Sequence, residues 1–109
     1  MMDTGQLKEA LHLLTLGYQN NPDRWEFPYY LAFLNLFYFG NSEAALAYLK
    51  ESVVKPGAPP FVTTLSVALS HRLNKTQIMV DYLKGIYYSS KDPEIRRKIV
   101  QVLHDLSKG

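Results

Sequence analysis

Residues 25–48 read WEFPYYLAFLNLFYFGNSEAALAY, and this segment decides how the rest of the chain can fold. It predicts two helices joined by a tight turn at Gly40, because glycine adopts left-handed backbone angles at no steric cost. The first helix is apolar nearly all round between Tyr29 and Phe39, so it needs neighbours on more than one side. The second begins with small residues such as Ala45, which allow two helices to approach closely. We therefore expect a central helix pair here.

Four more helices are expected on either side of this pair, with turn-forming residues between them. Asp3 or Thr4 can cap the first one, and Asp92 followed by Pro93 is a typical start for the last. The run PGAPP and, later, Asn74 break the chain between helices. No segment alternates with period two for long enough to predict a strand. The four expected helices cover residues 5–19, 60–73, 76–88 and 93–107.

The composition is that of an ordinary globular domain. The chain has 109 residues, of which 47% are hydrophobic, so it can bury a single core and is too apolar for disorder. A formal charge of +2 does not favour a nucleic-acid partner, which selects much more positive charge. There is no cysteine, and hence no disulfide or thiol nucleophile. Because no signal peptide or membrane-spanning run is visible, we expect a cytoplasmic domain.

Turn residues and small residues recur along the chain with a nearly constant period. Gly5, Gly40 and Asn74 are 35 and 34 residues apart. Other positions repeat in the same register, and their residues are Ala10, Ala45 and Met79, then Leu14, Leu49 and Leu83, then Gly17, Ser52 and Ile86, with Pro22 and Pro56 closing the first two copies. A turn residue that starts a helix, a small residue that lets it approach its neighbour and a proline that ends it form a helix-pair unit. This pattern resembles the tetratricopeptide repeat.

The resemblance implies an all-α fold, an α-α superhelix of three antiparallel helix pairs with about six helices in one domain. Residues 5–22 resemble the second half of a repeat, 25–56 a full repeat, 59–92 a degenerate repeat and 93–107 a capping helix. The segments NPDRWEFPYYLAF, PGAPP and KDPEIRRKI also look like the C-terminal part of larger bacterial proteins of this family.

The resemblance also implies a function, that of a non-enzymatic scaffold. Such a scaffold holds a peptide or partner helix in a groove lined by the first helix of each pair. We expect core packing to take about half of the aromatic residues in 29–39, and the remainder to face this groove. Lys98 is expected at the groove edge, where it could meet a carboxylate. The expected groove residues are Tyr29, Tyr30, Phe33, Phe37, Thr63, Val67, His71 and Lys98.

The first helix supports an alternative, a structural module that dimerises or docks on upstream repeats. Its apolar residues cover a wider arc than one neighbouring helix hides, and uncovered leucines favour association. The expected self-association face consists of Leu7, Leu11, Leu13, Leu14 and Tyr18.

No residue pattern predicts a reaction. His12, His71 and His104 are far apart in the sequence and stand in no metal-binding motif, so we expect no metal, no cofactor and no enzyme activity. Lys91, Arg96, Arg97 and Lys98 form the one basic cluster. A solvated helix face explains it, and an acidic peptide or a nucleic-acid backbone are alternative partners for it.

Overall fold

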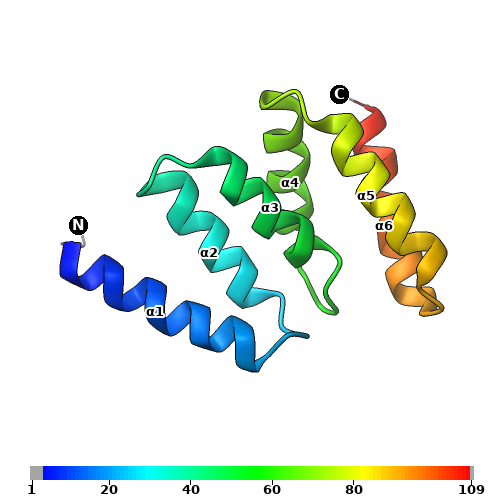
Figure 1. Cartoon of the computed structure of the whole chain (residues 1–109). Coiled ribbons are helices and arrows are strands. Elements are labelled where there is room, and N and C mark those ends of the chain that lie inside the picture. Colours follow the sequence, from blue (N-terminus) through cyan, green and yellow to red (C-terminus); the bar gives the residue numbers. More distant parts are fainter. Residues whose placement is uncertain (1–3, 109) are drawn as a thin grey trace.

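A computed structural model describes residues 4–108, with Thr4 described through its backbone alone, and these residues form six α-helices and no strand. The all-α fold class is confirmed. Each helix reverses the direction of the one before it, and the N- and C-termini lie at opposite ends of the molecule (Figure 1). The helices are α1 (Thr4–Asn20), α2 (Glu26–Phe37), α3 (Ser42–Val53), α4 (Pro60–Arg72), α5 (Thr76–Ser89) and α6 (Pro93–Ser107).

The predicted turn residues hold the chain where the helices meet. Gly40 has φ of 64° and Asn74 has φ of 56°, the left-handed values that end helices. Asn41 caps α3 by accepting a hydrogen bond from the backbone N–H of Ala44, at 3.1 Å. Asp92 caps α6 in the same way. Of the two caps proposed for the first helix, Asp3 lies outside the described residues, and Thr4 is the first residue of α1.

The expectation that α2 reaches Phe39 is wrong by two residues. The N–H groups of Tyr38 and Phe39 both bond to the carbonyl of Leu34, at 2.9 and 3.1 Å. The second bond spans five residues instead of four, so the regular helical pattern ends before Gly40. Tyr38 and Phe39 therefore lie in the turn, and both are exposed. At the other end of α2, Pro28 is buried in the first turn, where its missing N–H has no helical partner to lose.

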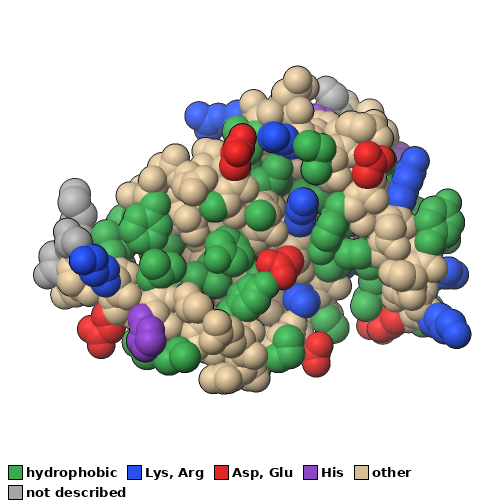
Figure 2. Space-filling model, in the orientation of Figure 1, with side chains coloured by type: hydrophobic (Ala, Val, Ile, Leu, Met, Phe, Trp, Pro, Cys, Tyr) green, Lys and Arg blue, Asp and Glu red, His purple; other side chains and the backbone are tan. Residues whose placement is uncertain are grey.

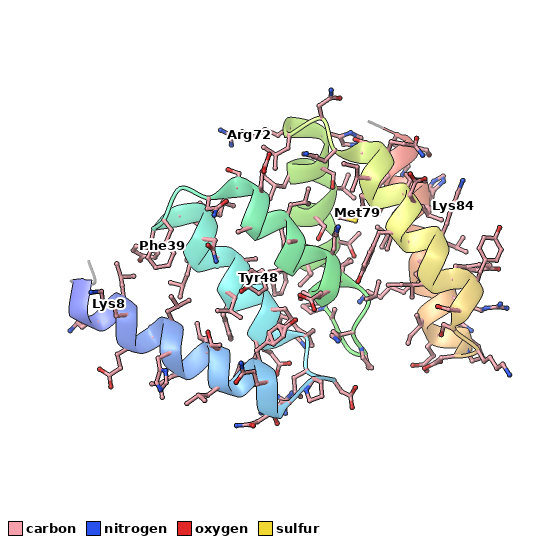
Figure 3. All side chains as sticks on the ribbon, viewed as in Figure 1. Lys8, Phe39, Tyr48, Arg72, Met79 and Lys84 are labelled. Carbon is pink, nitrogen blue, oxygen red and sulfur yellow. The ribbon has the colours of Figure 1, made fainter. Side chains whose placement is uncertain are left out.

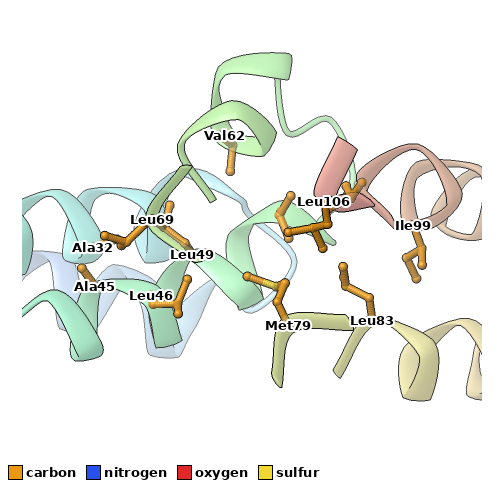
Figure 4. Packing of buried hydrophobic residues seen from close by; sticks show 12 residues of the cluster. Ala32, Ala45, Leu46, Leu49, Val62, Leu69, Met79, Leu83, Ile99 and Leu106 are labelled. Atoms are coloured by element: carbon orange, nitrogen blue, oxygen red, sulfur yellow. The ribbon is translucent and has the colours of Figure 1, made fainter. Parts of the chain in front are cut away.

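The core runs through the middle of the helix stack. Ala32 of α2 and Ala45 of α3 are fully buried and lie together at one end of it (Figure 4), which confirms that small residues bring these two helices close. Leu31 and Leu34 of α2 are also buried, and the rest of the core comes from α3 to α6. The fully buried large members from these helices are Leu49, Val53, Val62, Met79, Leu83, Ile99 and Val102.

The molecule is elongated, with extents of 41 × 29 × 19 Å. Helix α1 packs on α2, α2 on α3, and α3 on α4, while α4 contacts both α5 and α6. Helix α4 borders one hollow together with α2 and another together with α6. Within residues 4–108, no helix combines the length and the apolar character that crossing a membrane requires.

Candidate functional site

Three aromatic side chains on α2 form an exposed row. Tyr30, Phe33 and Phe37 are three and four residues apart, a spacing that puts them on one side of a helix. They expose 46%, 39% and 61% of their surface. The rings of Phe33 and Phe37 touch, with centroids 4.6 Å apart. We call Tyr30, Phe33 and Phe37 the aromatic stripe.

Tyr29 belongs to a second group of rings, which links α2 to α4. It is half-buried, and its ring lies 5.8 Å from that of Trp25 and 5.3 Å from that of Phe61, measured between centroids. Phe61, in the first turn of α4, is half exposed and also contacts Trp25. Neither Trp25 nor Phe61 was predicted from the sequence as a partner of Tyr29. The position of Phe61 directly after two prolines that start a helix is a signal that could have found it.

The expectation that the core takes about half of the aromatic residues in 29–39 is wrong. Of these rings only that of Tyr29 is half-buried, and the other five are exposed. The buried side of this helix is instead made by the aliphatic residues Leu31, Ala32 and Leu34. The rings are exposed because three share one side of the helix and two lie beyond its end.

A hollow of about 410 Å³ opens between α2 and α4, and we call it the α2–α4 hollow. Phe37 belongs to it, so it is continuous with the aromatic stripe. Its walls are mainly apolar, and Arg72 is its one charged residue. The full lining is Leu36, Phe37, Ser42, Leu65, Ala68, Leu69 and Arg72.

A second hollow, of about 630 Å³, lies on the other side of α4, between its N-terminal half and α6. Lys98 lines it and donates a hydrogen bond to the backbone carbonyl of Ala58, and partial burial lowers the pKa of this lysine. Asp105 lies there too, accepting from Gln101 and 4.0 Å from the ammonium of Lys108. The lining comprises Ala58, Pro60, Thr63, Thr64, Glu94, Arg97, Lys98, Gln101 and Asp105.

The structure spreads the groove residues expected on α4 over different environments. Thr63 is buried and lines the hollow beside α6, and Val67 is half-buried. His71 bonds through Nδ1 to the hydroxyl of Thr76, at 2.9 Å, so its ring is held against the start of α5. Its Nε2 is buried and has no hydrogen-bond partner within the described part of the chain. The bond to Thr76 therefore holds His71 to the start of α5.

The basic cluster is divided in the same way. Arg96 donates to the carbonyls of Tyr87 and Ser90, at 3.2 and 2.9 Å, and its guanidinium lies 4.7 Å from the centre of the Tyr87 ring. It thus closes the C-terminal end of α5. Of the other members, Lys98 holds Ala58, while Lys91 and Arg97 are exposed. Charges of both signs are interspersed on the face shown in Figure 2.

The expected self-association face is also divided. Leu7, Leu11, Leu14 and Tyr18 fall on one side of α1 and are half-buried. Tyr18 marks the direction of that side, because its hydroxyl bonds to Glu51 of α3 and its ring packs edge-on against Tyr48. Leu13 lies on the outer side and exposes 58% of its surface, next to Leu16, which exposes 41% and was missed.

His12, His71 and His104 lie on α1, α4 and α6, and no group of three potential metal ligands occurs among residues 4–108. Comparisons with family models, with curated proteins and with solved structures gave no match. The resemblance to the tetratricopeptide repeat therefore remains a prediction.

Proposed function

We propose that this chain is a non-enzymatic interaction scaffold that holds a peptide or partner helix against the surface formed by α2, α4 and α6. The observation that carries the proposal is the aromatic stripe and its continuity with the α2–α4 hollow. Exposed aromatic residues beside an apolar depression are the usual anchors of protein recognition, because rings supply a large contact area at a small entropy cost.

The rings of the aromatic stripe are only partly covered in the free protein. Tyr30, Phe33 and Phe37 leave roughly half of their surface in water while Leu31, Ala32 and Leu34 fill the core. Burying a large apolar side chain is worth about 1.5–3 kcal/mol. The stripe thus holds binding energy that folding does not use, and replacing its rings should cost binding and leave the fold intact.

The test is selection of peptides from a random 16-residue phage-display library on the immobilised protein. Peptides enriched on the wild type should be lost on the double variant Tyr30→Ala, Phe37→Ala. They should be kept on a matched control, Tyr88→Ala with Val100→Ala, which also removes two exposed apolar side chains but far from the stripe. Circular dichroism should show the same helical signal for all three proteins. No enrichment on the wild type, or equal enrichment on the double variant, rejects the proposal.

A second candidate function is self-assembly or docking through α1, and the exposed pair Leu13 and Leu16 favours it. These residues form an apolar spot on the outer side of a terminal helix of the stack. The test is the oligomeric state, measured by sedimentation at several concentrations.

A further inference from the structure

We propose that the α2–α4 hollow selects the sequence of the partner. It takes one large apolar side chain, and Arg72 at its rim takes the carboxylate of an Asp or Glu beside that side chain. This inference rests on the proposed scaffold function and adds the chemistry of the segment that binds.

The size and walls of the hollow fit an apolar side chain. Its volume is about 410 Å³, whereas a cavity of about 150 Å³ in a protein core already holds a benzene ring. A Phe, Leu or Trp side chain therefore fits, together with part of the adjoining backbone. The walls come from Leu36, Leu65 and Leu69, and the exposed Ala68 leaves room between them.

The charge at the rim is free for a partner. Arg72 is the last residue of α4, is exposed, and has no carboxylate partner within residues 4–108. Figure 3 shows its side chain extending away from the end of the helix. Glu43 is the acidic residue next to Ser42 in the lining, but it pairs with Lys75 and not with Arg72. Its Oε1 lies 3.9 Å from Nζ of Lys75. A guanidinium matches a carboxylate in a bidentate geometry, so an acidic residue is the complement of this rim.

The larger hollow beside α6 does not allow such a conclusion. Its lining contains Glu94 and Asp105 together with Arg97 and Lys98, so both signs of charge are present. Of these two hollows, only the α2–α4 hollow combines apolar walls with a single sign of charge.

The test uses the same peptide library on three further variants. On the wild type, the enriched peptides should share a large apolar residue with Asp or Glu within about one helical turn of it. Arg72→Glu should replace that acidic residue with Lys or Arg in the enriched set, and Arg72→Gln should remove the charge preference. Ala68→Leu should narrow the hollow at this position and weaken the binding of a selected peptide by about tenfold or more, since even one methylene group in an apolar pocket discriminates side chains by about 10–200-fold. The control is Lys84→Glu, which reverses an exposed charge on α5, outside both hollows, and should select the wild-type set.

The outcomes separate the two proposals. Peptides that depend on the aromatic stripe but are the same for wild type, Arg72→Glu and Ala68→Leu overturn this inference and leave the scaffold function standing. If no peptide is enriched on the wild type, both are overturned. All the substituted residues are exposed helical positions and receive residues of good helix propensity, so the variants should keep the wild-type circular dichroism spectrum.

Discussion

Gly17 is the residue at which a single methyl group should disturb the stack most directly. A Cβ atom added there would lie 2.2 Å from Cε1 of Phe27, well inside the van der Waals distance. The missing side chain of Gly17 lets α1 lie directly on the ring of Phe27 at the start of α2. None of the leucines of α1 is fully buried, so this close contact helps to hold the helix on α2.

We expect Gly17→Ala to lower the free energy of unfolding by about 1 kcal/mol. Alanine gains about 0.8–1 kcal/mol of helix propensity over glycine, but overpacking against Phe27 costs about 1–3 kcal/mol. Urea denaturation measures the difference. Gly85→Ala is the matched control, because this helical glycine of α5 has nothing within 4 Å of its added Cβ, so it should gain the propensity alone. Equal stabilisation by both substitutions would mean that Phe27 moves aside freely.

Tyr18 should make the free energy of unfolding fall as the pH rises in the alkaline range. Partial burial, and then its hydrogen bond to Glu51, raise the pKa of Tyr18 from 10.0 to about 12. The unfolded chain loses this proton near pH 10 and the folded chain near pH 12. The contribution of Tyr18 is therefore complete below pH 10 and is lost as the pH rises from 10 to 12.

Urea denaturation between about pH 9 and 12 spans the ordinary pKa of tyrosine, about 10. Over this range the free energy of unfolding of Tyr18→Phe should fall less than that of the wild type. A residual slope is expected, because burial and Glu51 also raise the pKa of Tyr82. Tyr88→Phe changes a highly exposed ring and should leave the wild-type slope unchanged. An identical slope for Tyr18→Phe would show that neither burial nor the bond to Glu51 raises the pKa of Tyr18 in solution.

At the scale of helices, Arg96 is the residue that joins the last two. It bonds to carbonyls at the end of α5 from the first turn of α6 and stacks on Tyr87. We expect Arg96→Ala to lower the free energy of unfolding by about 1–2 kcal/mol, through the lost charged hydrogen bonds and cation–π contact. The neighbouring Arg97→Ala should change it by less than about 0.5 kcal/mol, since Arg97 is exposed. If chemical denaturation gave similar losses of stability for Arg96→Ala and Arg97→Ala, both arginines would simply belong to one solvated basic face.

The boundaries of the helices could be predicted because local chemistry sets them. Gly40 and Asn74 end helices by adopting left-handed angles. Asn41 and Asp92 cap the N-termini of α3 and α6, and Pro60 and Pro93 are the first residues of α4 and α6. Each residue acts through its own backbone or side chain. These signals need no knowledge of neighbouring helices, and the predicted ends agree with the structure to within two residues.

The faces of the helices were harder to predict, because they depend on neighbours that the sequence does not show. On α4 the buried side includes Ser66 and Ser70, whose hydroxyls bond to carbonyls one turn earlier, at 2.7 Å, and so need no other partner. Ala68, which is apolar, is exposed in the α2–α4 hollow. Hydrophobicity alone assigns these residues to the wrong sides. For the same reason it could not tell that aliphatic residues of α2 fill the core while the rings stay outside.

At the scale of the whole molecule, two apolar surfaces compete as the place where a partner binds, and their sizes distinguish them. The surface along α2 and α4 combines three rings with a hollow of about 410 Å³. The outer side of α1 has only Leu13 and Leu16, which expose 58% and 41% of their surface.

A symmetric dimer through α1 would bury two such leucines from each copy. Full burial of a leucine is worth about 1.5–3 kcal/mol, so four that are half exposed supply about 3–6 kcal/mol. Association costs about 4–15 kcal/mol in lost translational and rotational freedom, so this contact alone should not hold a dimer at micromolar concentration. We expect sedimentation equilibrium to give the monomer mass at about 10–100 μM, far below the millimolar range in which so weak a contact would act. Leu13→Ser with Leu16→Ser should not change that mass. A dimer at these concentrations that the double serine variant dissociates would show that α1 gains contacts from the other copy beyond its two leucines, and would make self-assembly the better account of this chain.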